Sequence, residues 1–480
     1  MEIVNKSLFL LPARSETVFN LVCFLADFLE KLPLIEESIR EADFISFDEE
    51  MTSLPPKQFA EFYMSPEQTY RQIRETRGDI IQLGISCFKA DPETATWHAK
   101  TFCIYVFPRR LHRTAPRRYL SFETSALEFM VENGFDYTKL FKEGVSYIRE
   151  DLQEEWRAEF FRGHNVTEEN AEELEKEFEL HCGVAKVVKM MVDRKCPIVG
   201  HNMALDLMCL SGMLMPGGAP ETLDGFKKQM RDAFGAVYDT KILATSKAFC
   251  ANRKTSLGEM YNFVQMDIFP KLPLVIPEGF PDYVRGGQCH DAGFDAYMTG
   301  YVFIALMNAL RCGNVNANPV KAVVDKSTKE VVEYKMDKTD FGTFCVDGEI
   351  LRPYNGLIAM GSRCFDTFNL HGQESMELFN RTFVLKDYSP DWRKQDIMAL
   401  FSPIGSVNIK FLGEGVCAVS MYKPEKDSVM FHAFITRSAT YKKIREMCFF
   451  NLKKSLKEIG CKDTSCLITT MDEYTKYMFN

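Results

Sequence analysis

The feature that most constrains this chain is a short run of apolar and small residues, 44–47, that leads directly into two carboxylates, Asp48 and Glu50. Such a run predicts a buried β-strand, and side chains along a strand alternate between its two faces. Asp48 and Glu50 therefore lie on one face, where two like charges are costly unless a cation lies between them. The pair predicts a divalent cation with oxygen ligands, and so a metal-dependent hydrolase, if the rest of the chain supplies further ligands. A solvated strand edge is the alternative.

Three further residues qualify as ligands or as a catalytic base. Asp206 lies in a predicted helix, residues 202–213, among apolar neighbours, where an unpaired carboxylate is expensive. His290 and Asp295 are separated by four residues at the start of a long apolar helix that is predicted to reach about residue 310. The alternatives are a surface aspartate at Asp206 and a helix-capping or first-turn acid at Asp295. Four carboxylates and one imidazole suit two metal ions, with the histidine as base because its pKa lies near neutrality.

The order of the predicted elements indicates an α/β chain. Three successive strands predict an antiparallel meander, and two later strands alternate with helices. This order indicates a mixed sheet with helices on both faces. The five strands span residues 42–51, 79–88, 101–107, 196–200 and 237–239.

The pattern divides the chain into two domains and their connections. The larger domain, residues 36–312, includes a strongly acidic segment, about 149–182, that we interpret as a helical hairpin. The order strand, helix, strand, strand, helix over 376–458 is that of a small α+β domain like the RNA-recognition motif. The remaining parts are an N-terminal segment with an insertion, a linker or exposed hairpin, and a C-terminal tail, at 1–35, 313–375 and 459–480.

Charge and cysteine content limit the classes of function. The net charge of −9 over 480 residues argues against indiscriminate wrapping of nucleic acid, although five arginines fall within residues 109–118. This basic track predicts either a rim that contacts phosphate or a solvated loop. The 15 cysteines have no paired short spacing and no secretory signal opens the chain, which favours reduced thiols in the nucleus or cytoplasm. The longest apolar stretch, residues 19–34, is interrupted by charged residues, so we expect no stable membrane insertion.

Several motifs resemble those of a known family. The exonuclease motifs of the DEDD superfamily, in its histidine-bearing branch, are similar to residues 48–50, 198–206 and 290–297. The closer resemblance is to the poly(A)-specific ribonuclease family, with further support from residues 105–108, 238–242 and 255–257. The resemblance implies a ribonuclease-H-like exonuclease fold, two Mg²⁺ ions with Mn²⁺ as a substitute, and a homodimer. It also implies 3′→5′ release of nucleotides from RNA 3′ ends.

The resemblance implies a role for each candidate residue. His290 would be the general base, and the metal ligands would be Asp48, Glu50, Asp206 and Asp295. The residues expected to bind substrate are Asn202, Arg109, Phe107 and, in a supporting role, Asp239. Phe411, near the end of the second strand of the small domain, would stack on a base or an mRNA cap, although a core phenylalanine is the interpretation that we favour. The third strand of that domain has no aromatic residue on which a base could stack.

The chain departs from the family pattern in three places. Glu49 and Met51 stand where the family usually has glycine and phenylalanine. Glu49 is expected on the opposite face of the strand, whereas Met51 could change how the terminal base is held. The family's long nucleic-acid-binding insertion is replaced by the short acidic segment, and residues 8–27 resemble extra sequence.

The sequence leaves open which RNA is the substrate and whether the chain is an active enzyme. Poly(A) tails and the 3′ extensions of small-RNA precursors, such as those of Piwi-interacting RNA, are both compatible with the motifs. A catalytically inactive RNA-binding scaffold of the same fold is the alternative to an enzyme. A DNA exonuclease is disfavoured by the domain that resembles an RNA-recognition motif.

Overall fold

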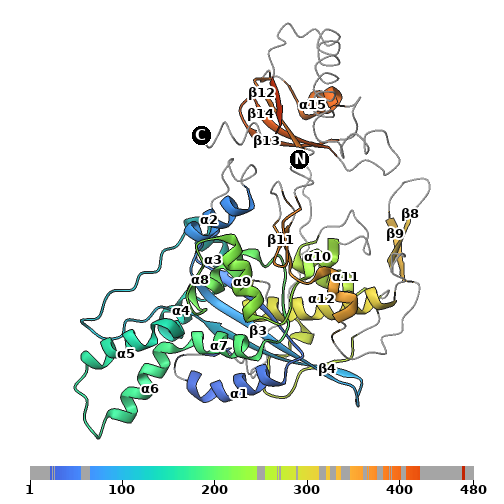
Figure 1. Cartoon of the computed structure of the whole chain (residues 1–480). Helices are drawn as coiled ribbons and strands as arrows, with labels where there is room; N and C mark the ends of the chain where they lie inside the picture. Colours follow the sequence, from blue (N-terminus) through green and yellow to red (C-terminus); the bar gives the residue numbers. More distant parts are fainter. Residues whose placement is uncertain are drawn as a thin grey trace, which may run out of the picture.

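The computed structural model describes a larger and a smaller domain (Figure 1). The described residues are 22–23, 25, 27–55, 65–245, 255–266, 269, 272–287, 290–312, 320–324, 331–336, 346, 348–360, 365, 367–375, 382–388, 390, 392–401, 407–421 and 467–470. Most of the expected N-terminal insertion, and the helix expected at 440–456, lie outside these residues.

Among the described residues, a mixed seven-stranded sheet forms the centre of the larger domain. Its strands follow the order β1-β4-β3-β2-β5-β6, and β7 also pairs with β4. Strand β3 is antiparallel to both β2 and β4, as expected for a meander, whereas β5 is parallel to β2 and to β6. The strands are β1 (Val22–Cys23), β2 (Phe44–Met51), β3 (Ile80–Asp91), β4 (Thr96–Tyr105), β5 (Ile198–Gly200), β6 (Val237–Asp239) and β7 (Leu274–Val275).

Helices cover both faces of this sheet, which confirms the predicted α/β class. One face is covered by α1 (Phe28–Glu41), α7 (Val184–Arg194), α8 (Ala204–Met213) and α9 (Leu223–Ala233). The other face is covered by α10 (Thr240–Thr245), α11 (Leu257–Val264) and α12 (Ala292–Cys312). The remaining helices of this domain include α2 (Pro66–Thr76), α3 (Thr124–Glu132), α4 (Tyr137–Glu143), α5 (Gln153–Arg162), α6 (Ala171–Cys182) and α13 (Gly348–Leu351). None of the helices in the described ranges is both long and apolar enough to cross a membrane.

The alternation along β2 decides which face each of its side chains reaches. Ile45 and Phe47 are buried on the side of α1, α7 and α8. Phe44 is buried on the side of α12, and the hydroxyl of Ser46 donates a hydrogen bond of 2.6 Å to the carbonyl oxygen of Ala296 in α12. The even-numbered residues of β2 therefore face α12, so Asp48 and Glu50 continue toward the start of that helix.

The acidic segment and the range expected to be a linker both contain regular structure. Helices α5 and α6 occupy the acidic segment and extend to one end of the domain (Figure 1). Within 313–375, strand β8 (Val320–Val324) pairs with β9 (Val331–Met336), and β10 (Leu357–Ala359) pairs with β11 (Thr367–Asn369).

The β10–β11 hairpin is part of the larger domain rather than a linker. Ile358 and Phe368 are fully buried in the core on the side of α8 and α9. Lys227 of α9 forms an ion pair of 2.5 Å with Glu374, and the exposed fractions of the two side chains are only 6% and 9%. The pattern of the sequence did not indicate this packing because the apolar runs of the hairpin are short and their partners, β6 and α9, lie far earlier in the chain.

The smaller domain is built on a four-stranded antiparallel sheet in the order β13-β14-β12-β15. Its elements are β12 (Thr382–Lys386), α15 (Lys394–Phe401), β13 (Val407–Gly413), β14 (Val416–Met421) and β15 (Leu467–Thr470). The first four follow the predicted order of strand, helix, strand, strand. Because β15 pairs with β12, the sheet includes residues from the range 459–480 that was expected to be a tail.

Candidate active site

Two residues of β3 hold the start of α12 against the acidic end of β2. Gly84 lies opposite Asp48, and Gln82 lies opposite Glu50, in the antiparallel pair. A Cβ atom at Gly84 would lie 1.8 Å from the carbonyl oxygen of Ala292, so only glycine permits this approach of α12. The side-chain oxygen of Gln82 accepts a hydrogen bond of 2.9 Å from the backbone N–H of Ala292. The helix start is thereby fixed beside both carboxylates.

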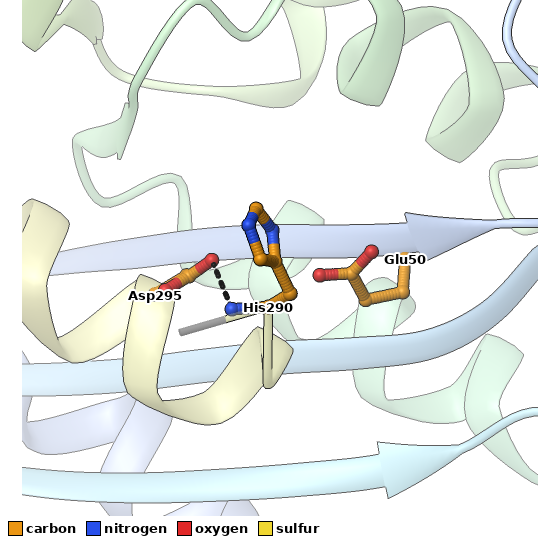
Figure 2. Close-up of side chains that lie close together, drawn as sticks. All are labelled: Glu50, His290 and Asp295. Atoms are coloured by element: carbon orange, nitrogen blue, oxygen red, sulfur yellow. Dashed lines mark hydrogen bonds between the residues drawn. The ribbon is translucent and has the colours of Figure 1, made fainter. Parts of the chain in front are cut away.

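His290 and Asp295 lie at this helix start. The carboxylate of Asp291 accepts a hydrogen bond of 3.1 Å from the backbone N–H of Phe294, so the cap is Asp291 and Asp295 lies in the first turn of the helix. The backbone N–H of His290 donates to Asp295 at 3.2 Å (Figure 2). His290 has a φ of 65°, a left-handed conformation that costs about 1–2 kcal/mol for most residues. Figure 2 shows its ring between the carboxylates of Asp295 and Glu50.

Asp206 reaches the same place from α8, on the other side of β2. Its charge raises the pKa of Asp48, Glu49 and Glu50, after burial in each case, so its carboxylate lies close to the acidic end of β2. The side chain is half-buried and lines a cleft. This position favours a ligand over a solvated surface residue, and the role of Asp206 as a ligand stays a prediction.

The five residues of the predicted set all line one cleft of about 1200 Å³. Candidate ligand atoms of Glu50, His290 and Asp295 lie within 4.8 Å of one another. No lysine or arginine occurs among the described residues that line this cleft. Within the described lining, the cleft therefore gathers carboxyl groups with no lysine or arginine to balance them.

Burial and mutual repulsion favour the protonated forms of these carboxyls. Burial, followed by the charges of Asp295, Asp206 and Glu50, raises the pKa of Asp48 well above its usual range. Burial and then the charges of Asp295 and Asp206 raise the pKa of Glu50. Burial is also the main cause that raises the pKa of Asp206 and that of Asp295. A bound divalent cation would reverse these shifts because it favours the ionised form of each carboxylate.

The donor set fits a hard divalent cation. Carboxylate oxygens, with one imidazole beside them, are the ligands that suit Mg²⁺ and Mn²⁺. Oδ1 of Asp295 is buried and has no hydrogen-bond partner within the described part of the chain. An unpaired buried oxygen of this kind is costly, and a cation in the cleft would satisfy it.

Glu49 and Met51, the two departures from the family pattern, border the cleft. Glu49 is only 6% exposed, and neither of its carboxylate oxygens has a hydrogen-bond partner among the residues that the structure describes. Burial, followed by the charge of Asp206, raises its pKa well above the usual range. The sulfur of Met51 lies 3.5 Å from that of Cys209 on α8.

Phe129 on α3 is a residue that the sequence pattern did not single out. It lines the cleft and is 45% exposed, and its ring contacts the ring of His290 edge-to-face, with the centroids 4.7 Å apart. An exposed aromatic face beside a site that binds nucleic acid is suited to stacking on a base. Nothing in residues 124–132 distinguishes Phe129 from an ordinary core residue of a short helix, so only the contact reveals it.

The residues expected to bind substrate lie in three different environments. Asn202 lines the cleft, whereas Asp239 does not and is only 1% exposed. Phe107 and Arg109 line a separate cavity of about 330 Å³. The guanidinium of Arg109 donates hydrogen bonds of 2.8 Å to the carbonyl oxygens of Gly144 and Lys142. Phe107 and Arg109 therefore lie outside the acidic cleft, because the loop after β4 turns toward α4, and their contact with substrate stays a prediction.

Phe411 lies on β13 in the smaller domain, at the edge of its sheet. Its side chain is 47% exposed. The favoured interpretation of Phe411 as a core residue is therefore wrong, and its ring has an exposed surface.

A mixed sheet that presents carboxylates from its central strand and from the helices on both faces is the architecture of a ribonuclease-H-like nuclease. Comparison with protein families agrees: residues 25–303 match the model of the CAF1 family ribonuclease. The chain therefore belongs to the CAF1 ribonuclease family. The prediction of an enzyme of the 3′→5′ exoribonuclease class is confirmed.

Individual relatives have low sequence identity, but their alignments cover most of the chain. The poly(A)-specific ribonuclease PARN of Danio rerio is 23% identical and covers 83% of this chain and 73% of its own length. The pre-piRNA 3′-exonuclease trimmer of Bombyx mori is 22% identical over 60% of this chain and 71% of its own. The poly(A)-specific ribonuclease PNLDC1 of Mus musculus is 23% identical over 59% of this chain and 70% of its own length. Among solved structures, the RNase domain of yeast Pop2 matches 62% of this chain and 89% of its own, with 13% identity and a TM-score of 0.38.

Proposed function

We propose that this chain is a Mg²⁺-dependent 3′→5′ exoribonuclease that removes nucleotides from RNA 3′ ends. The observation that supports this proposal most strongly is the convergence of four carboxylates and His290 in one cleft with no balancing protein cation among its described lining. Divalent cations bound there would activate the scissile phosphate and the attacking water. We assign the ligand positions to Asp48, Glu50, Asp206 and Asp295.

The side chains around these ligands have separate tasks. Burial lowers the pKa of His290, so its ring is neutral near pH 7 and can accept a proton from the attacking water. The hydrogen bond between its backbone N–H and Asp295 fixes the backbone of His290 beside that ligand, and its ring packs edge-to-face on Phe129. Phe129 supplies a stacking face for the 3′-terminal base, and Asn202 lines the same cleft.

Two classes of RNA fall within this proposal. Relatives of the chain are named as poly(A)-specific ribonucleases and as a pre-piRNA 3′-exonuclease. The acidic helices α5 and α6 expose glutamates such as Glu155 and Glu173, which repel phosphate and disfavour a long binding track along that surface. This feature favours trimming of short 3′ extensions over processive removal of a long tail.

A catalytically inactive RNA-binding scaffold is the alternative. It would not need to keep all five residues in one cleft with an unpaired buried oxygen at Asp295. The expected homodimer, the nuclear or cytoplasmic location, and base or cap stacking by Phe411 stay predictions.

The test uses 5′-labelled RNA that ends in either oligo(A) or mixed sequence, incubated with the purified chain and with Mg²⁺ or EDTA. A ladder that shortens from the 3′ end only when Mg²⁺ is present is the expected result. Absence of such a ladder would contradict the proposal. Equal rates on both substrates would exclude specificity for poly(A), and faster shortening of oligo(A) would exclude sequence-independent trimming.

A further inference from the structure

Asp239 is a buried carboxylate that lies behind the cleft and has no described cationic partner at hydrogen-bond distance. It ends β6, directly opposite Gly200 at the end of β5. Its side-chain oxygens accept four backbone N–H hydrogen bonds: from Asn202 and Lys241 at 2.9 Å, from Met203 at 3.3 Å and from Ala359 at 2.9 Å. A carboxylate has about four acceptor positions, so N–H groups from three separate backbone segments occupy the whole acceptor capacity of Asp239.

Two of these donors belong to the loop that leads into α8. Asn202 has a φ of 60°, a left-handed conformation that needs support from its surroundings. The same loop is held by His201, whose ring nitrogens lie 2.8 Å from the hydroxyl of Thr240 and 3.0 Å from the carbonyl oxygen of Thr255. The loop ends where α8 begins, and Asp206 lies in the first turn of that helix. The position of the loop therefore sets the position of Asp206.

The fourth donor belongs to the β10–β11 hairpin. This hairpin covers the edge of β6: the backbone N–H of Gly356 donates to the carbonyl oxygen of Val237 at 2.8 Å, and the side-chain oxygen of Asn355 accepts from the N–H of Val237 at 3.1 Å. It is also held to α9 by the ion pair between Lys227 and Glu374. A single carboxylate thus joins the hairpin to the loop before α8.

We propose that Asp239 is a positioning residue: it connects the β10–β11 hairpin to the loop before α8 and so holds Asp206 in place to bind a divalent cation. This inference rests on the proposed function of the cleft. It replaces the expectation that Asp239 contacts substrate, since a residue that is 1% exposed and fully hydrogen-bonded has no face left for RNA.

The test compares Asp239→Asn with a matched control, Asn355→Ala. The first change replaces one acceptor oxygen by an N–H₂ group that faces backbone N–H donors, so two donors lose their partner. The second removes a hydrogen bond between the same hairpin and the same strand but leaves the loop before α8 untouched. Mn²⁺ binding is measured by electron paramagnetic resonance without RNA, and kcat and KM are measured on 5′-labelled RNA.

The expected result is that Asp239→Asn weakens Mn²⁺ binding about tenfold or more and lowers kcat, with KM for RNA close to that of the wild type. Asn355→Ala lowers the melting temperature but keeps wild-type Mn²⁺ affinity. Wild-type Mn²⁺ affinity in Asp239→Asn, or a rise in KM alone, would overturn the proposal. A wild-type chain that binds Mn²⁺ without degrading RNA would contradict the proposed function instead.

A second variant keeps the proposal testable if Asp239→Asn does not fold. Ala359→Pro removes the N–H that the hairpin donates to Asp239, fixes φ at that position and leaves the carboxylate in place. We expect weaker Mn²⁺ binding, by a smaller factor than for Asp239→Asn. Unchanged Mn²⁺ affinity in a folded Ala359→Pro variant would overturn the connection to the hairpin.

Discussion

The acidic cleft and the arginine-rich loop, residues 109–118, are two regions of concentrated charge. They differ in whether the protein itself satisfies the charged groups. In the cleft, carboxylates from β2, α8 and α12 converge while Oδ1 of Asp295 has no described hydrogen-bond partner. In the loop, two of the arginines donate to backbone carbonyls, Arg109 to Gly144 and Lys142 and Arg110 to Ala115, whereas Arg113 and Arg117 are exposed.

The aromatic contacts of the loop reinforce this difference. Arg118 lies over the rings of Tyr147 and Trp156, at 4.5 and 5.3 Å from their centroids, and donates to the hydroxyl of Ser146. Charge that the protein itself satisfies stabilises the fold, whereas charge that it leaves unsatisfied is free to bind a ligand. We therefore propose that the cleft carries the chemistry and that Arg109, Arg110 and Arg118 stabilise the fold.

The largest effect is expected for Asp48→Ala. Loss of one metal ligand should lower kcat by about 10³-fold or more, because metal activation contributes several kcal/mol to catalysis. Folding should be retained, since removal of one carboxylate from a cluster of like charges relieves repulsion. Rates on 5′-labelled RNA and melting temperatures without metal measure the two effects. Wild-type activity in this variant would show that Asp48 is not a ligand.

A smaller effect is expected for Phe129→Ala. Loss of a stacking face should raise KM for RNA about tenfold, because stacking of an aromatic side chain on a base contributes about 1–3 kcal/mol. Tyr119→Ala is the control: Tyr119 is 78% exposed but does not line the cleft. Steady-state kinetics on short RNA measure both variants. Equal KM values for Phe129→Ala and the wild type would remove Phe129 from the substrate site.

For Arg109→Ala we expect lower stability and an almost unchanged KM for RNA. Loss of its two hydrogen bonds should lower the free energy of unfolding by about 1–3 kcal/mol, while KM for RNA stays within about twofold of the wild type. Denaturant unfolding and the same kinetic assay separate the two quantities. If KM rose strongly while stability stayed unchanged, Arg109 would contact RNA and the contrast between the two regions would fail.

The smallest effect is expected for Glu49→Gln: a change in the free energy of unfolding that depends on pH. The pKa of Glu49 is raised in the folded chain, so its contribution to stability is fully present below the unfolded pKa, about 4.3, and is lost as pH rises. Glu49→Gln should therefore be more stable than the wild type at pH 8, by about 1 kcal/mol, and similar to it at pH 4. Urea unfolding at both pH values measures the difference. A variant that is less stable at pH 8 would show that the ionised carboxylate has a partner in the folded chain.

Local patterns in the sequence predict the elements that carry the ligands. Alternation along residues 44–51 predicts the shared face of Asp48 and Glu50, and apolar periodicity predicts the helices that carry Asp206 and Asp295. These features were accessible because each depends on residues close in sequence. The resemblance of the motifs then identified the family that the comparison confirms.

The features that the sequence did not reveal depend on contacts between distant segments. Gln82 and Gly84 contact the backbone of Ala292, more than 200 positions away in the sequence. No local pattern indicates these contacts. The β10–β11 hairpin resembled a linker because its short apolar runs join a core only when β6 and α9 are beside them. Arg109 was assigned to substrate because a charged side chain shows in the sequence, whereas the backbone carbonyls that satisfy it do not.

The most direct test of the acidic cleft as a metal site is titration calorimetry of the wild-type chain with Mg²⁺ and with Mn²⁺ near pH 7.5, beside Asp48→Ala and Arg109→Ala. We predict saturable binding of two ions to the wild type and to Arg109→Ala, and binding at least about tenfold weaker in Asp48→Ala. A wild-type chain that binds neither ion, or an Asp48→Ala chain with wild-type affinity, would contradict the assignment of the cleft.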